Sequence, residues 1–161
     1  MTIAYRRSRT EDLQDMRGFW MERWGDDFMV VHGVIYRPED LEGFIAVDGR
    51  RWVGVITYTF RETECEIISL DSLREGQGIG TSLIEKVVAE AIQAGCGRVC
   101  LITTNDNLGA LGFYQKRGFR LVRVNREAVN ESRRIKPSIP LIGEQGIPIR
   151  DEIELEMKLN S

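Results

Sequence analysis

The stretch that decides the fold runs from residue 76 to residue 94 and reads GQGIGTSLIEKVVAEAIQA. It begins with three glycines in five residues and continues with adjacent apolar pairs every four positions, which is typical of an amphipathic helix. Gly95 follows, and glycine commonly ends a helix. We therefore predict a glycine loop followed by a helix over residues 79–94. Its apolar stripe consists of Leu83, Ile84, Val87, Val88, Ala91 and Ile92.

The glycine loop predicts a binding site for a phosphate or pyrophosphate. Glycines let the backbone turn sharply and approach a ligand, and the first N–H groups of a helix have no partner within it. Two known phosphate-binding patterns fit poorly. A P-loop needs a lysine after the last glycine, and a dinucleotide fingerprint needs its third small residue at the position of Thr81. On its own, the loop is equally compatible with a simple tight turn.

The rest of the chain predicts strands and helices that alternate around one sheet, which places the protein in the mixed α/β class. Asp48 and Gly49 suit the turn of a hairpin. Thr10 is the expected N-cap of a first helix, and residues 24–38 are expected to form a loop or a short helix. Further helical spacing covers residues 107–117. Strands are expected at residues 3–7, 44–47, 52–60, 64–70, 99–102, 119–124 and 153–159.

Length and composition indicate a single globular domain over residues 1–161. The chain is 42% hydrophobic and 29% charged, with a formal net charge of -3, which weighs against a dedicated nucleic-acid partner. The chain has three cysteines, which is a small and odd number and therefore unlike a disulfide scaffold, so we expect a reducing, cytoplasmic setting. Because no apolar run approaches about 20 residues, we expect no membrane partner.

A second motif follows at residues 107–119, which read NLGALGFYQKRGF. A Gly-x-Gly-Ile-Gly loop opening a long helix, then a strand, then Asn-x-x-Ala-x-x-Phe-Tyr-x-Lys-x-Gly-Phe resembles the GNAT superfamily of acyl-CoA N-acyltransferases. The resemblance covers about residues 43–124. It implies a mixed, mostly antiparallel central sheet of six to seven strands with about four flanking helices. It also implies that the fourth and fifth strands splay apart.

The resemblance further implies acetyl-CoA as co-substrate and no metal. In this family, main-chain amides of the glycine loop hold the coenzyme A pyrophosphate, and the preceding strand, here at Leu70 and Asp71, pairs with pantetheine. Asn107 matches a residue that contacts the pantetheine arm, and Tyr114 matches one near the thioester sulfur. Glu75 stands where the family usually has Arg or Gln, and the neighbouring Arg74 is a candidate for the missing positive charge. The matching loop residues are Gly76, Gln77, Gly78, Ile79, Gly80 and Thr81.

Amide formation from a thioester requires a base, an oxyanion donor and a proton for the departing thiolate. Tyr114 is the candidate acid, with simple aromatic packing as the alternative, and the N–H of Leu70 is the candidate oxyanion donor. Glu66 and Glu64 are candidate bases, since some family members use a glutamate on this strand. Strict alternation places both glutamates on a face with Ile68 and Leu70, unless a bulge interrupts the strand. Alternatively, they are solvated edge charges.

Other polar residues allow two interpretations each. His32, the only histidine, is expected to be structural or at the surface rather than a base. The basic residues Arg133, Arg134 and Lys136 form a solvated face or bind a carboxylate of the acceptor or a coenzyme A phosphate. Residues 135–151 carry three prolines and two glycines, and we expect this loop to fold over the acceptor side.

These observations favour an N-acetyltransferase that moves the acetyl group of acetyl-CoA to a primary amine of a small molecule or a protein. Transfer is expected by direct attack in a ternary complex, because no cysteine lies where an acyl-enzyme would need it. One alternative is a catalytically silent coenzyme A sensor with the same fold, and another is a nucleotide-phosphate-binding protein. Pairing into a homodimer is left open.

Overall fold

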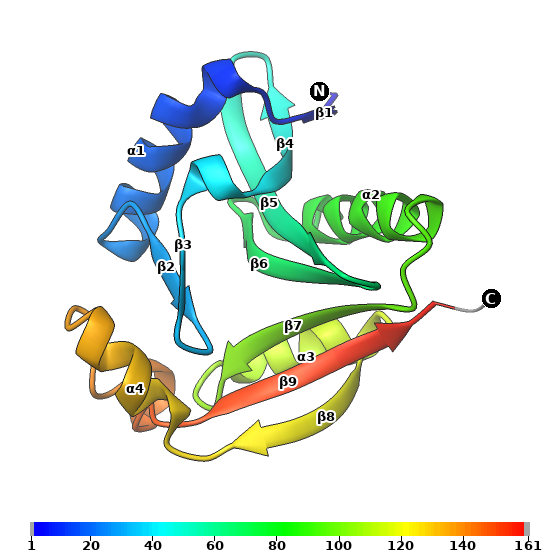
Figure 1. The fold of residues 1–161 in the computed structure, drawn as a ribbon. Coiled ribbons are helices and arrows are strands. Elements are labelled where there is room, and N and C mark those ends of the chain that lie inside the picture. The colour runs from blue at the N-terminus through cyan, green and yellow to red at the C-terminus, as the bar shows by residue number, and fades with distance from the viewer. Residues whose placement is uncertain (1, 160–161) are drawn as a thin grey trace. The chain divides into compact units, whose positions relative to one another are not determined.

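The structure is a computed structural model that describes residues 2–159. The chain divides into two compact units (Figure 1). Residues 2–15, 39–99 and 158–159 belong to the first unit, and residues 16–38 and 100–157 to the second. Seven strands form one sheet in the order β1-β4-β5-β6-β7-β9-β8. The expected mixed sheet of six to seven strands is confirmed.

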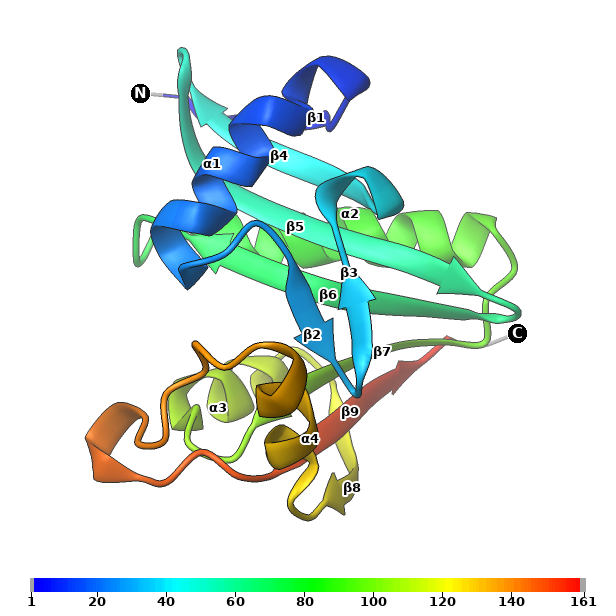
Figure 2. The ribbon, with the colours of Figure 1, turned by 60° about the vertical axis from the view of Figure 1, so that its left-hand side comes forward.

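The first unit is an antiparallel sheet with a helix on one face. Helix α2 (Ile79–Gln93) packs across β4, β5 and β6 (Figures 1 and 2). The helix predicted over residues 79–94 is therefore confirmed to within one residue. In sheet order, the strands are β1 (Ala4–Arg7), β4 (Glu42–Asp48), β5 (Arg51–Arg61) and β6 (Glu64–Ser72).

The β4–β5 hairpin turns where the Asp-Gly pair predicts. Asp48 pairs with Arg51, so Gly49 and Arg50 form a two-residue turn, and Gly49 has a φ of 65°. Glycine adopts this left-handed conformation without the steric cost that other residues carry. The turn thus fixes the pairing of β4 with β5.

The start of α2 lies very close to β5 at Gly54. A Cβ atom built on Gly54 would lie 2.5 Å from Cγ2 of Ile79 and 3.2 Å from Cδ1 of Leu83. Both side chains are at most 1% exposed, so glycine is what allows this approach. The predicted stripe is wrong at Ile92, which is 59% exposed, because residues spaced by four advance about 40° around the helix.

The second unit has its own strands and helices, and helix α1 (Leu13–Trp24) and strand β7 (Arg98–Thr104) continue into it from the first unit. Helix α3 contacts β8, and α4 contacts β2. The remaining elements are β2 (Met29–Val31), β3 (Val34–Tyr36), α3 (Leu108–Lys116), β8 (Arg120–Asn125), α4 (Ala128–Ile135) and β9 (Glu152–Lys158). Short 3-10 turns occur at Thr10–Asp12, Pro38–Asp40 and Glu144–Gly146.

The expectation of a loop or short helix over residues 24–38 is wrong. The segment contains a small hairpin, β2–β3, which forms a separate two-stranded sheet (Figure 2). Its turn consists of His32 and Gly33, with φ values of 50° and 77°. Strands of three residues are too short to show alternation, and histidine is a weaker turn signal than asparagine or aspartate at such a position.

The predicted N-cap at Thr10 is also wrong. Thr10 lies inside the 3-10 turn, and Arg9 is the cap residue. The carboxylate of Asp12 accepts the Arg9 N–H at 2.8 Å and is held by the guanidinium of Arg6, also at 2.8 Å. The hydrogen bond from Arg6 lowers the pKa of Asp12. Asp12, three residues after the cap, thus bonds the main chain at Arg9, where the strand β1 has ended and the 3-10 turn begins.

Candidate active site

The glycine loop has the backbone geometry of an anion site. Gly76 and Gly78 are exposed, with φ values of 74° and 71°. No described atom lies within 4 Å of the Cβ position of either residue. Gly78 immediately precedes α2, and its carbonyl accepts the Ser82 N–H at 2.9 Å. The main-chain amides at the start of α2 thus follow an open, left-handed backbone, which suits phosphate oxygens.

The other predicted loop residues differ in burial. Gln77 is exposed, whereas Ile79 and Gly80 are buried in the first turn of α2 and Thr81 is half-buried. Ile79 therefore contributes packing that fixes the loop, and its main-chain amide is what a ligand could contact.

The residue that departs from the family pattern points to solvent, and its neighbour is engaged elsewhere. Glu75 is exposed. The guanidinium of Arg74 pairs with the carboxylate of Asp48 at 2.9 Å, next to the β4–β5 turn. The hydroxyl of Ser72 donates to the Arg74 carbonyl at 3.1 Å. Arg74 thus ties the loop to the hairpin.

A bulge in β6 changes which residues share a face. Thr57 pairs with Ser69 but Tyr58 pairs with Ile67, so Ile68 has no counterpart on β5. The hydroxyls of Thr57 and Ser69 lie 2.5 Å apart, which places both side chains on one face. Directly opposed residues point to the same face of a sheet. The prediction that the two glutamates share a face with Leu70 is therefore wrong, and Ile68 is the extra residue of the bulge.

The polar face of β6 carries both candidate bases. Because of the bulge, the side chains of Ser69 and Asp71 point to the same face as those of Glu64 and Glu66. Asp71 is 3% exposed and pairs with Val55, whereas Leu70 pairs with Ile56 and is half-buried.

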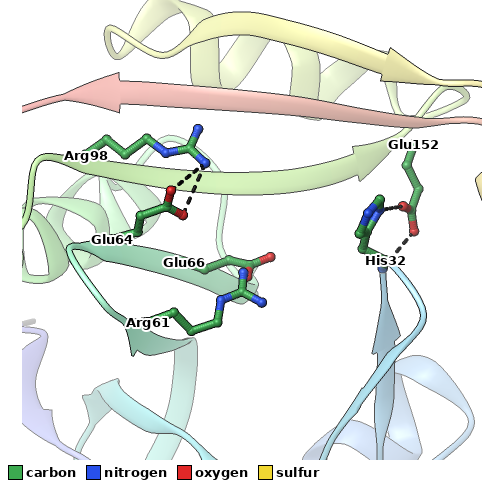
Figure 3. A network of polar contacts seen from close by, with 6 residues as sticks. All are labelled: His32, Arg61, Glu64, Glu66, Arg98 and Glu152. Carbon is green, nitrogen blue, oxygen red and sulfur yellow. Dashed lines mark hydrogen bonds and ion pairs between the residues drawn. The ribbon is translucent and has the colours of Figure 1, made fainter.

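Each glutamate pairs with a different arginine within the first unit (Figure 3). Arg61, at the end of β5, donates to the carboxylate of Glu66, whose side chain is 4% exposed. Arg98, at the start of β7, donates to Glu64 at 3.1 Å, and the Glu64 side chain is 36% exposed. Glu66 is thus a buried carboxylate and Glu64 is a partly solvated one.

Asn107 and Tyr114 lie in the second unit. The side-chain oxygen of Asn107 accepts the Ala110 N–H at 3.1 Å and caps α3. The ring of Tyr114 is 9% exposed and meets Phe113 and Phe119 edge-on, with centroids 5.4 and 5.5 Å apart. Both residues therefore have structural roles, in addition to any contact with a ligand.

His32 is held at its hairpin turn by a buried acid, as Figure 3 shows. Glu152 is 3% exposed and accepts the His32 N–H, and its other oxygen lies 3.1 Å from Nδ1 of the ring. The His32 side chain itself is 63% exposed. This arrangement agrees with a structural or surface histidine.

Two of the three basic residues after β8, Arg133 and Lys136, bond main-chain carbonyls. The guanidinium of Arg133 donates to the carbonyls of Ile139, Pro140 and Ile149, at 3.2, 2.8 and 2.8 Å. Lys136 is 8% exposed and donates to the Phe28 carbonyl at 3.2 Å. Burial lowers the pKa of the Lys136 ammonium group. These contacts leave Arg134, an exposed residue of α4, as the solvated one of the three.

The loop over residues 139–149 is anchored from β7 as well. Asp106 is 5% exposed, accepts the Thr104 hydroxyl at 2.5 Å and accepts the Glu144 N–H at 3.3 Å. Asn105 donates to the Pro148 carbonyl at 2.9 Å. A long loop with these internal contacts is an ordered part of the fold.

Sequence reasoning missed Arg61, Arg98, Asp106 and Glu152 as partners of the site. A signal existed for Arg61, since it and Glu64 flank a two-residue turn at which Glu62 has a φ of 52°. The partners Arg98 and Glu152 come from distant segments and leave no local pattern. Among residues 2–159, no group of three or more His, Cys, Asp or Glu is placed to hold a metal ion. In the same range, no helix has the length and apolarity needed to cross a membrane.

Comparison with known proteins identifies the family. The model of the Acetyltransferase (GNAT) family matches residues 8–119. The Bacillus subtilis (strain 168) protein YdhI is 48% identical over 136 residues, which cover 84% of this chain and 85% of YdhI.

Solved structures show the same fold. An IAA acetyltransferase from Bacillus cereus has a TM-score of 0.75 at 24% identity, covering 98% of this chain and 100% of that one. A GNAT family acetyltransferase from Elizabethkingia anophelis, solved with acetyl-CoA bound, has a TM-score of 0.71 at 21% identity and covers 98% of both chains. With a family match over most of its length and this fold, the chain belongs to the GNAT acetyltransferase family.

Proposed function

We propose that the protein transfers the acetyl group of acetyl-CoA to a primary amine of a small molecule or a protein, by direct attack in a ternary complex. The observation that carries this proposal is the open glycine backbone before α2, at Gly76 and Gly78. A side chain at either position would be strained by the positive φ and would stand where a phosphate oxygen must approach the amides.

The residues present fit acetyl-CoA. The amides of Gln77, Gly78, Gly80 and Thr81 would bind the pyrophosphate, with Gly76 beside them and Ile79 fixing the helix start. The backbone of Leu70 and Asp71 would pair with pantetheine, and Asn107 would contact the same arm. Acetyl-CoA supplies an acyl group activated as a thioester.

The chain's own groups supply the acid–base chemistry. A free alkylamine has a pKa of about 10.4 and must lose a proton before it attacks. Glu66, or less directly Glu64, takes that proton, either itself or through a water. The N–H of Leu70 donates to the oxygen on which charge develops, and the hydroxyl of Tyr114 donates a proton to the departing sulfur.

We also propose that residues 1–161 act as one acetyltransferase domain in the cytoplasm. The family match crosses both compact units, which supports one catalytic domain. Cys65, Cys96 and Cys100 are all buried and none is in a disulfide, which is usual in a reducing compartment.

The test combines binding with turnover. Calorimetry should detect binding of coenzyme A and acetyl-CoA, and a panel of primary amines, including peptide N-termini, should reveal acetyl transfer. Tyr114→Phe keeps the packing ring and should lower kcat by about 100-fold or more. Tyr36→Phe, at a tyrosine that is 8% exposed, is the matched control and should change kcat little.

Three results would count against the proposal. No binding of coenzyme A or acetyl-CoA would overturn it entirely. Tight coenzyme A binding without turnover would favour the silent sensor. Greater thermal stabilisation by ATP or NAD than by acetyl-CoA would favour a nucleotide-phosphate-binding protein.

A further inference from the structure

Glu66 is a carboxylate in a place that normally disfavours charge. Its side chain is 4% exposed and lies near the start of β6. Burial favours the protonated form of a carboxyl group, and a protonated carboxyl group cannot accept a proton from an amine. A base at this position therefore needs something that keeps it ionised.

Arg61 is the group that does so. Its guanidinium donates to the Glu66 carboxylate, while its own side chain is 51% exposed (Figure 3). A cation within hydrogen-bonding distance favours the charged form of a carboxylate, and an N–H donor fixes the direction of the oxygen it bonds. Arg61 therefore supplies both charge and orientation.

The pairing of Arg61 is specific. The strand register sets Arg61 opposite Glu64, yet Arg61 bonds diagonally to Glu66. Arg98, from β7, donates a hydrogen bond to the Glu64 carboxylate at 3.1 Å, and the Glu64 side chain is 36% exposed. Arg61 thus bonds the buried glutamate, and Arg98 bonds the partly exposed one.

The charged groups that face Glu66 within the first unit come from three strands. Arg61 comes from β5, Glu64 and Asp71 share its face of β6, and Arg98 comes from β7 and pairs with Glu64. Glu64, two residues away on the same face, opposes ionisation of Glu66, and Arg98 is bonded to Glu64. Arg61 is therefore the cation that acts on Glu66 directly.

We propose that Arg61 is a positioning residue for acetyl transfer, holding the Glu66 carboxylate charged and aimed while it accepts the proton of the acceptor amine. The inference rests on the proposed function, with Glu66 as its base. Arg61 acts through Glu66 and need not touch the acceptor or the thioester.

The experiment is the pH profile of kcat/KM for one amine acceptor. It compares the wild type with Arg61→Gln, Arg61→Lys and the control Arg98→Gln, which breaks the matched pair at Glu64. Without Arg61, Glu66 holds its proton to higher pH, so the acidic limb of the Arg61→Gln profile should move up by about 1 to 3 pH units. Ionisation of the free amine is the same for every variant and cancels in the comparison.

The shape of the profile separates positioning from structural damage. At high pH, Glu66 loses its proton even without Arg61, so the Arg61→Gln rate should approach the wild-type rate there. Arg61→Lys restores a cation and should return most of the shift. Arg98→Gln removes the partner of Glu64 and not of Glu66, so it should move the limb much less than Arg61→Gln does. Calorimetry should show unchanged coenzyme A affinity for all variants.

Several results would overturn the inference alone. In a wild type that transfers acetyl groups, these are an unmoved limb in Arg61→Gln, an equal loss of rate at every pH, or a shift caused by Arg98→Gln instead. A wild type that binds coenzyme A but transfers no acetyl group would instead overturn the proposed function, and the inference with it.

Discussion

Replacing Gly54 by alanine would push a methyl group into the contact between β5 and the first turn of α2. The new Cβ would lie 2.5 Å from Cγ2 of Ile79, 3.2 Å from Cδ1 of Leu83 and 3.2 Å from the Asp71 carbonyl. Carbon atoms in contact lie about 3.5 to 4.0 Å apart, so α2 or β5 must move by about 1 Å. Both helix side chains are buried and have no open space to enter.

Overpacking of this kind costs about 1 to 3 kcal/mol. Alanine also restricts the unfolded chain, which offsets about 0.4 to 1 kcal/mol. From the middle of each range, the net loss in the free energy of unfolding is about 1.3 kcal/mol, which lowers Tm by about 3 to 5 °C in a chain of this size. Because the displaced turn also carries the glycine loop, coenzyme A should bind more weakly as well.

Urea unfolding and thermal unfolding of the purified variant measure the first effect, and calorimetry with coenzyme A measures the second. Gly97→Ala is the matched control, because its Cβ would meet only the Thr63 carbonyl at 4.0 Å. If Gly54→Ala proved as stable as this control, close packing between α2 and β5 would not be what requires a glycine at residue 54.

Two further predictions concern stability at high pH and the cap of α3. Burial, and then the nearby charge of Glu90, raise the pKa of Tyr58 to about 12, so the folded state favours the protonated phenol. The contribution of Tyr58 to the free energy of unfolding should therefore be fully present below about pH 10 and be lost towards about pH 12. Urea midpoints should show this loss in the wild type but not in Tyr58→Phe. Asn107→Ala removes the cap of α3 and should cost about 1 kcal/mol, whereas Asn107→Asp keeps the accepting oxygen but loses the amide donor. If Asn107→Asp folds like the wild type and yet binds coenzyme A more weakly, the amide contacts the cofactor; equal affinity would contradict that role.

The parts of the fold that the sequence predicted correctly are those whose signals are local. The helix over residues 79–94 begins and ends at glycines and carries its apolar residues on one side, and the hairpin turn at Gly49 needs only two residues to be recognised. Each pattern is contained in fewer than twenty consecutive residues. The fold class and the position of the glycine loop followed from them.

The parts that were missed depend on contacts between distant residues. The bulge at Ile68 shows no sequence signal, because its neighbours are all apolar or small, yet it decides which face carries the glutamates. The pairing of Glu66 with Arg61 follows from the register that the Glu62–Thr63 turn sets and from the burial of Glu66, and burial depends on distant parts of the chain. Likewise, Arg133 reads as a surface charge until its three carbonyl partners are known.

The way in which Arg133 holds residues 139–149 bears on which residues of this loop can change. Its guanidinium bonds main-chain oxygens, and the Asn105 and Asp106 side chains also bond the backbone of this loop. Because these hydrogen bonds involve main-chain atoms of the loop, they do not depend on which side chains the loop carries. Leu141 and Ile142, at 70% and 56% exposed, can therefore be exchanged for other residues without loss of the loop's shape. Substitutions there can change which molecules the loop contacts.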